Sequence, residues 1–199
     1  RASLEKGRKA LGRYGLDKEV DQMYPFELSG GMARRVLIGT AVVEQPQLVI
    51  ADEPTPGLHL EAAVRVLSHF REIADQGAGV LLITHDLELA LKTADRIVVF
   101  YAGTAVEEAA TVDFNQEAAL RHPYTRALLS AVPSPVLQER RGRIILKGDV
   151  PSPANPPAGC RFHTRCEQCR EICTRREPEL KPLKTDEKHL VACHFAEQP

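Results

Sequence analysis

The chain has 199 residues, 43% of them hydrophobic, and a formal net charge of −1 from 26 basic and 27 acidic residues. This length and composition suit one medium-sized domain, or a domain with an appended module, that buries an apolar core. The charge balance gives no global electrostatic case for nucleic acid or a membrane surface as a partner, and no apolar run approaches the length of a membrane-spanning helix. The first ten residues contain neither a Met nor a signal-peptide core, so we expect the chain to begin inside a longer protein.

The hydrophobic pattern predicts helices that alternate with short strands. In chain order, the expected elements are a short helix, a turn around Gly15 and a loop through Tyr24-Pro25-Phe26 within residues 1–27, a helix at 32–43, a strand at 47–53, a helix at 61–76, a strand at 80–84, a helix from Asp86 to about Ala94, and a strand and turn at 96–103. The runs at 47–53 and 80–84 are continuously apolar, which is typical of strands buried on both faces of a parallel sheet. The alternation therefore predicts an α/β fold with a parallel sheet and flanking helices.

The composition changes after Ala131. Residues 132–159 are rich in proline and turn-forming residues, with 143–146 as their only strand-like piece, and we interpret them as a linker between a domain at 1–131 and a small module at 160–199. All five cysteines fall in that module, four of them between Cys160 and Cys173 and the fifth at Cys193. In a chain without export features this clustering favours a metal or cluster site over a disulfide framework.

Ser29, Gly30 and Gly31 precede the predicted helix at 32–43. A helix N-terminus offers unpaired backbone N–H groups and a positive dipole end, and glycines let a phosphate approach without a Cβ in the way. A capped helix with a flexible turn has the same pattern. Taken alone, these three residues favour that simpler interpretation.

Polar residues at the ends of the two predicted strands strengthen the case for a phosphate site. Asp52 and Glu53 end the strand at 47–53, where open α/β sheets place their ligand sites. One carboxylate there can hold Mg²⁺ while the next orients and activates a water molecule. His85 follows the next strand and is placed to reach a γ-phosphate and position that water.

These segments resemble, in order and spacing, the motifs of ABC-type ATPases. LSGGMARR resembles the signature motif, LVIADE the Walker B strand with the catalytic glutamate, PTPGLH the D-loop, and ITHD the switch histidine. The resemblance implies a partial ABC-type nucleotide-binding domain in which Asp52 binds Mg²⁺ and Glu53 and His85 act on the attacking water. It also implies that Ser29, Gly30 and Gly31 cap the γ-phosphate of ATP bound to the opposite subunit of a head-to-tail dimer.

Two features depart from the family pattern. The chain contains neither G-x-x-x-x-G-K-[ST] nor an obvious Q-loop, so the phosphate-cradling loop and its Lys are missing, and we expect the chain alone to be inactive. His59 stands where the D-loop usually has Asp. It remains a candidate nucleotide-site residue, but its contact across the dimer, and the symmetry of the two ATP sites, are in question.

Segments after His85 narrow the resemblance to the ATP-binding subunits of peptide and nickel importers. They are ADRIVVFYAGTAVEE, RHPYTRALLSAVPSP and the tail GCRFHTRC to HLVACH. The resemblance implies that four cysteines hold a [4Fe-4S] cluster, namely Cys160, Cys166, Cys173 and Cys193. Thiolates suit Zn²⁺ equally, and Cys166-x2-Cys169, which adds a fifth cysteine, keeps a zinc knuckle as an alternative. Unliganded buried cysteines are the third interpretation.

The resemblance implies an ATP-hydrolysing subunit that energises an importer of short peptides or a related solute such as nickel. Its implied partners are a second ATPase subunit, identical or homologous, a transmembrane permease at the cytoplasmic face of the membrane and, indirectly, an extracytoplasmic solute-binding protein. One alternative is an excision-repair-like ABC ATPase that binds DNA, which the few aromatic residues and the absence of Trp disfavour. Another is a non-enzymatic metal-binding remnant, which has no need of Asp52, Glu53 and His85.

Overall fold

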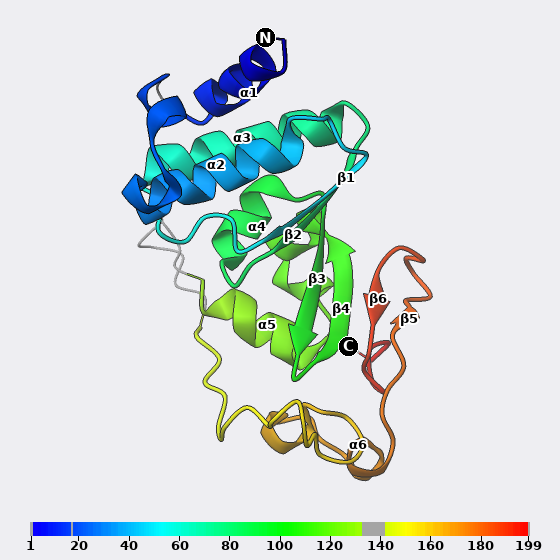
Figure 1. Cartoon of the computed structure of the whole chain (residues 1–199). Coiled ribbons are helices and arrows are strands. Elements are labelled where there is room, and N and C mark those ends of the chain that lie inside the picture. The colour runs from blue at the N-terminus through cyan, green and yellow to red at the C-terminus, as the bar shows by residue number, and fades with distance from the viewer. Residues whose placement is uncertain (1, 17, 133–141, 199) are drawn as a thin grey trace. The chain divides into compact units, whose positions relative to one another are not determined.

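The structure, a computed structural model, describes residues 2–16, 18–132 and 142–198. The chain forms two compact units, Arg1–Asp86 and Leu87–Pro199, whose elements are labelled in Figure 1. In these described ranges no helix is both long enough and apolar enough to cross a bilayer.

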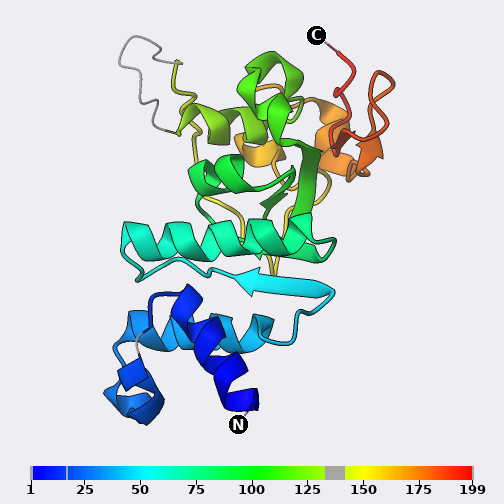
Figure 2. The same ribbon diagram turned by 90° about the horizontal axis from the view of Figure 1, so that it is seen from above.

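The first unit contains most of the predicted motifs. Its elements are α1 (Ala2–Arg13), the 3-10 helices η1 (Lys18–Gln22) and η2 (Pro25–Glu27), α2 (Gly30–Val42), β1 (Leu48–Asp52), α3 (Leu60–Asp75) and β2 (Gly79–Ile83). These bounds confirm the predicted helices and strands to within two residues. Helices α1 and α2 pack against each other (Figure 2). Ser29 caps α2, because its Oγ accepts a hydrogen bond from the backbone N–H of Met32 at 3.3 Å.

Strands β1 and β2 pair in parallel, with Leu48 opposite Gly79 and Asp52 opposite Ile83. This confirms the predicted parallel pairing. The expectation that both strands are buried on both faces is wrong for the described chain. Val49 and Ala51 are buried, but one face exposes apolar side chains: Leu48 is 58% exposed, Ile50 62%, Leu81 51% and Ile83 46%. Helix α3 packs on β2 through its own buried apolar face, and the described residues leave the other sheet face open.

The second unit is built on an antiparallel sheet. Its elements are α4 (Leu87–Thr93), β3 (Arg96–Tyr101), β4 (Thr104–Ala110), η3 (Thr111–Asn115), η4 (Glu117–Ala119), α5 (Pro123–Ser130), η5 (His163–Arg165), α6 (Glu171–Arg175), β5 (Lys181–Pro182) and β6 (Leu190–Val191). The strand order is β3-β4-β6-β5, with antiparallel pairing throughout.

Strand β3 corrects the expectation of an all-parallel sheet. It lies where the sequence predicts a strand, but it pairs antiparallel with β4. The reason is the two-residue turn between them, in which Ala102 has φ 45° and Gly103 has φ 80°. Two successive residues with positive φ are the mark of a type I′ turn, whose twist matches that of a β-hairpin.

The core of the second unit joins the sheet to the cysteine-containing segment. Tyr101 on β3 contacts Phe162 edge to face, with ring centroids 5.1 Å apart, and both rings are buried. Residues 143–146 are not in a strand; the backbone N–H of Ile144 instead donates to Ser130 Oγ at 3.0 Å. Part of the predicted linker, residues 133–141, lies outside the described residues, and the predicted division at 131 and 160 remains a prediction.

Gly159 shapes the entrance to the cysteine module, which we define as residues 160–198. Its φ is +73°, and a Cβ there would lie 2.3 Å from the carbonyl oxygen of Cys173. That carbonyl accepts a hydrogen bond from the N–H of Cys160 at 2.8 Å. Only glycine permits this backbone approach, which brings two of the predicted ligand cysteines together.

Candidate functional site

Glu53 and His85, the two predicted catalytic residues, lie together at the carboxyl ends of β1 and β2. The Oε1 atom of Glu53 lies 2.7 Å from Nδ1 of His85 and accepts a second hydrogen bond from the His85 backbone N–H at 2.9 Å. The parallel register produces this meeting, because it aligns Asp52 with Ile83 and so places the residues that follow each strand side by side.

The surroundings of Glu53 suit a base. The hydrogen bond from His85 lowers the pKa of Glu53, and the same bond to the carboxylate raises the pKa of His85. The Glu53 side chain is 33% exposed, but its Oε2 atom is itself buried and has no hydrogen-bond partner among the described residues. Glu53 also has φ 45°, an uncommon conformation for a non-glycine residue and one that is concentrated at functional sites.

The signature segment lies beside the D-loop segment, Pro54–His59. A Cβ at Gly31 would lie 3.3 Å from the carbonyl oxygen of Gly57, and the Arg34 guanidinium donates to the carbonyl oxygen of Pro56 at 2.5 Å. Arg35 holds the other side of α2, since it donates to the carbonyl oxygens of Tyr14 and Gly15 at 2.9 and 3.2 Å. These contacts fix the start of α2 relative to the loop that follows β1.

The remaining predicted nucleotide-site residues have simpler surroundings. Asp52 ends β1 and is exposed. Ser29 and Gly30 are exposed at the start of α2. His59 caps α3, because its Nδ1 accepts from the N–H of Ala62 at 3.4 Å. Its structural role is thus helix capping, a role that the sequence prediction did not include.

The four cysteines predicted as ligands line one cavity of about 20 Å³. The other lining residues are His122, Pro123, Phe162, His163, Gln168, His194 and Phe195. Cys169 is not among them. Across residues 2–16, 18–132 and 142–198, no group of three or more His, Cys, Asp or Glu side chains is arranged to hold a metal ion. The metal-binding roles predicted for the cysteines and Asp52 therefore stay predictions.

Backbone N–H groups point at the cavity sulfurs. The N–H of Phe195 donates to Cys193 Sγ at 3.4 Å, and the backbone amides of Phe162 and His163 act to lower the pKa of the Cys160 thiol. Burial outweighs these bonds: it raises the pKa of Cys160 and Cys193, and that of Cys166 to about 11. Without a cation the thiols are protonated at neutral pH, while the N–H donors are placed to stabilise thiolates once a cation is bound.

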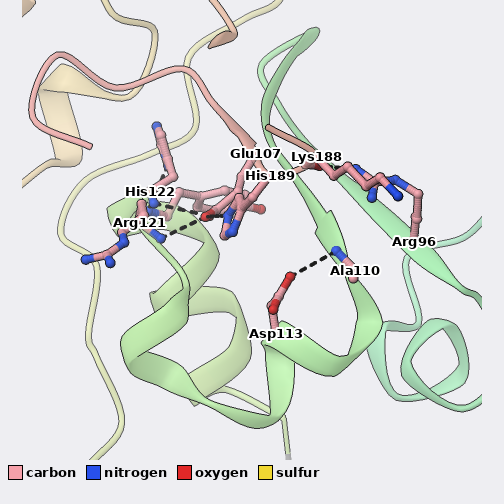
Figure 3. A network of polar contacts seen from close by, with 9 residues as sticks. Arg96, Glu107, Ala110, Asp113, Arg121, His122, Lys188 and His189 are labelled. Atoms are coloured by element: carbon pink, nitrogen blue, oxygen red, sulfur yellow. Dashed lines mark hydrogen bonds and ion pairs between the residues drawn. The ribbon is translucent and has the colours of Figure 1, made fainter. Parts of the chain in front are cut away.

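A buried carboxylate attaches the cysteine module to the sheet (Figure 3). Glu107, on β4, has no exposed surface. Its Oε1 accepts from the Arg121 N–H at 2.7 Å and bonds Nε2 of His189 at 2.8 Å, and its Oε2 accepts from the His122 N–H at 3.1 Å. Burial raises the pKa of Glu107, but the hydrogen bonds from His189, Arg121 and His122 outweigh it and leave the pKa below its ordinary value. Glu107 is therefore an ionised, fully partnered carboxylate.

Sequence reasoning missed Glu107, His122 and His189. A single Glu in an otherwise ordinary strand carries no signal by itself. Its partner His189 lies 82 positions later in the chain. In the sequence, His189 is visible only as a histidine shortly before Cys193. The sequence pattern alone does not indicate which carboxylate this histidine contacts.

Two family models match parts of the chain. The model of the family described as "ABC transporter" matches residues 1–56, and that described as "Oligopeptide/dipeptide transporter, C-terminal region" matches residues 106–173. Over these two segments the chain is similar to proteins of ABC transporters. The predicted resemblance is confirmed.

Two relatives show the same relationship along almost the whole chain. The oligopeptide transport ATP-binding protein AppF of Bacillus subtilis is 40% identical over 96% of this chain and 58% of its own length. The corresponding OppF of Haemophilus influenzae is 35% identical over 95% of this chain and 57% of its own length. The chain therefore spans less than two thirds of these relatives.

A solved structure shares the fold. The dimeric structure of MJ0796, a bacterial ABC transporter cassette, has a TM-score of 0.51 and 25% identity, and the match covers 54% of this chain and 46% of that one. The predicted α/β class is thus confirmed as a mixed α/β, ABC-type fold.

We predict that NMR titration of this chain gives His85 a pKa above its ordinary value. The Glu53 carboxylate stabilises the imidazolium, so Glu53→Gln should lower the His85 pKa toward the ordinary value. Glu61→Gln, which removes an exposed negative charge on α3, is the matched control and should leave the His85 pKa unchanged. Equal His85 pKa values in the wild type and Glu53→Gln would contradict the contact.

Because His122 is buried in its neutral form, we predict that the free energy of unfolding decreases in acid. His122 is 1% exposed, its Nδ1 accepts from the Tyr124 N–H at 3.1 Å, and burial lowers its pKa to about 4. Between pH 6.5 and about 4 the unfolded chain binds a proton that the native ring does not, so stability falls as pH falls, by at most about 3 kcal/mol. Glu107 adds a further loss at lower pH, as pH passes through its depressed pKa.

His122→Asn isolates that contribution, because Asn also accepts a hydrogen bond as a helix cap but does not titrate. Denaturant unfolding across this pH range should show a shallower decline for the variant than for the wild type. Parallel declines would show that His122 is not the titrating group.

Proposed function

We propose that the chain is part of an ATP-hydrolysing subunit that energises import of short peptides. The observation that carries the proposal is the Glu53–His85 pair at the carboxyl ends of two parallel strands, in a chain whose relatives are named oligopeptide transport ATP-binding proteins. The alternative substrate in this proposal is a related small solute such as nickel, imported by the same kind of transporter.

In this proposal the two oxygens of the Glu53 carboxylate have different roles in the activation of water. His85 fixes one oxygen of the Glu53 carboxylate, Oε1, and keeps the group ionised. Oε2 has no hydrogen-bond partner among the described residues, and in the complete subunit it would accept a proton from a water molecule aligned with the γ-phosphate. Asp52, exposed at the end of β1, has the carboxylate and the position to contact Mg²⁺. ATP and Mg²⁺ supply the phosphoryl group and the charge neutralisation.

Ser29, Gly30 and Gly31 serve an ATP bound to a second subunit. They are at the start of a 13-residue helix, where unpaired N–H groups and the positive dipole end favour a phosphate. The dimeric MJ0796 cassette has the same fold, which supports a pair of ABC subunits as the working unit. His59 replaces the usual acid, so a heterodimer with two unlike sites is as compatible with the chain as a homodimer.

The complete subunit needs residues beyond these 199. The phosphate-binding loop is supplied from outside the sequence, which spans 58% of AppF. The open apolar face formed by Leu48, Ile50, Leu81 and Ile83 supports the same conclusion, because such a face is costly to leave in water. The complete subunit works at the cytoplasmic face of the membrane on a transmembrane permease, and a solute-binding protein acts indirectly.

The cysteine cavity holds a [4Fe-4S] cluster in this proposal. A single Zn²⁺ binds sulfur at about 2.3 Å, which draws four sulfurs close around one point. The four sulfurs line a cavity of about 20 Å³, enough for one water-sized atom, and the described side chains are not arranged around one ion. The cavity volume therefore favours neither occupant, and the N–H donors at the sulfurs suit either; the proposal of a cluster rests on the four-cysteine set that the resemblance implies.

Glu53→Gln in a complete subunit should abolish ATP turnover, by at least about 100-fold, because the general base is removed. ATP-driven dimerisation should persist, since the neutral side chain leaves the phosphate contacts intact. Glu61→Gln is the matched control. Unchanged hydrolysis, measured as phosphate release from the reconstituted transporter, would refute the assignment of Glu53.

Metal analysis of the whole chain, purified without oxygen, tests the cofactor. We expect iron with an equal amount of acid-labile sulfide. Cys193→Ser should lose both, and Cys169→Ser, which changes a cysteine outside the cavity, should keep them. Zinc without sulfide would refute the cluster and support the zinc site. Absence of every metal would refute both assignments.

A further inference from the structure

His69 is a buried histidine of α3 that takes no part in the candidate ATPase site. It is 9% exposed and lies against Tyr14, the residue that follows α1, which is 1% exposed. The two rings are tilted by 55° with their centroids 5.3 Å apart, and the Tyr14 hydroxyl is hydrogen-bonded to Nδ1 of His69. At the other ring nitrogen, Nε2, a guanidinium nitrogen of Arg13 lies 2.6 Å away. These three residues, which we call the His69 cluster, join the end of α1 to α3.

The donor chemistry of Arg13 fixes the protonation state of His69 in this cluster. A guanidinium has N–H donors and no acceptor, so it can bond to Nε2 only while that nitrogen carries a lone pair. The ring proton of the neutral imidazole is therefore on Nδ1, where it is donated to the Tyr14 oxygen. An imidazolium carries a proton on both nitrogens. Protonation of His69 thus replaces the hydrogen bond from Arg13 by a contact between two cations.

Charged groups on α1 and α3 act on His69 in opposite directions. Burial of the ring is the largest effect and lowers the pKa of His69, and the positive charge of Arg13 lowers it further. The carboxylate of Glu72, one turn later on α3, lies 3.8 Å from the Arg13 guanidinium and favours a positive charge on the ring. The net result is a pKa below the ordinary value of 6.5, so the hydrogen bond from Arg13 is intact at neutral pH.

Helix α2 contacts the same tyrosine. A Cβ at Gly39 would lie 3.5 Å from the Tyr14 ring, so the missing side chain lets the ring pack closely against α2. Arg35, also on α2, donates to the carbonyl oxygens of Tyr14 and Gly15. The guanidinium of Arg65 on α3 is close to Gly15 as well, since a Cβ there would lie 2.6 Å from it. The end of α1 is therefore held both by α3 and by the helix that begins at the signature segment.

We propose that the His69 cluster is a pH-sensitive contact, closed while His69 is neutral and opened when its Nε2 binds a proton. Opening releases Arg13, the last residue of α1, from α3, while the hydrogen bond from Nδ1 to Tyr14 persists because both states of the ring carry a proton there. Between pH 6.5 and the lowered pKa of His69, the unfolded chain binds a proton that the closed cluster does not, so acid favours opening. The contact forms within one chain and needs neither ATP nor a partner subunit.

NMR titration of the whole chain tests the contact at His69 itself. Arg13→Gln replaces the cation by a neutral amide that can still donate, so the His69 pKa should rise by about one unit, as expected when a like charge within hydrogen-bonding distance is removed. The Arg13 side chain is 51% exposed, so the substitution leaves the core intact. Lys9→Gln, which removes an exposed positive charge one turn earlier on α1, is the matched control and should leave the His69 pKa unchanged. An unchanged His69 pKa in Arg13→Gln, or an equal rise in both variants, would overturn the proposal.

Amide hydrogen exchange, corrected for the pH dependence of the intrinsic exchange rate, tests whether the end of α1 opens. In the wild type, the N–H groups of Tyr14 and Gly15, which bond to the last turn of α1, should lose protection as pH falls through the His69 pKa. His69→Gln should keep that protection, because its side-chain oxygen accepts from Arg13 and does not titrate. Peptides from α5 report separately on the acid effect predicted for His122.

Equal loss of protection in the wild type and His69→Gln would show that another group controls the end of α1 and would overturn the proposal. Full protection of the wild type below the His69 pKa would overturn it as well. The Arg13→Gln titration decides the proposal even if the His69 variant fails to fold.

Discussion

A hydrogen bond between a carboxylate and an imidazole organises each of the two units, and burial decides what each bond does. Glu107 and His189 have almost no exposed surface, whereas the His85 side chain is 81% exposed and that of Glu53 33%. An ionised carboxylate without solvent is stable only when its oxygens are fully hydrogen-bonded, and Glu107 meets this condition with three partners. Glu53 has one saturated oxygen and one unpartnered oxygen. The buried pair is therefore structural, whereas the partly exposed pair keeps one carboxylate oxygen without a hydrogen-bond partner among the described residues.

The buried pair also explains how a small cysteine module is held in place. Strand β6 has two residues and makes few backbone hydrogen bonds to β4. The Glu107 carboxylate is hydrogen-bonded to His189, just before β6, and to the backbone N–H groups of Arg121 and His122 that precede α5. These bonds hold the module to β4 in addition to the strand pairing. Removing either member would leave a buried polar group without a partner, at a cost of a few kcal/mol. Such an anchor fixes the orientation of Cys193, four residues after His189, more firmly than a two-residue strand can.

The sequence predicted elements that depend on local pattern and missed features that depend on distant contacts. The helices, the strands and the meeting of Glu53 with His85 follow from periodicity and from the edge at which parallel strands end. The β3–β4 hairpin was not predicted because its turn contains Ala102, which rarely adopts positive φ. The exposed face of β1 was not predicted because an apolar run indicates that a residue prefers burial, not whether the chain supplies a cover. The Glu107–His189 pair joins positions whose proximity only the folded chain reveals.

His59 shows how a departure from a family pattern can leave the fold intact. The position precedes the first residue of α3, and its imidazole accepts the hydrogen bond that caps the helix. An aspartate there would accept the same bond, so the substitution keeps the cap and removes a negative charge. The change therefore falls on the exposed side chain and not on the packing of α3, whose buried face starts at Ala62. Any functional consequence of His59 must therefore arise where this exposed side chain meets another molecule, and not in the fold of the subunit.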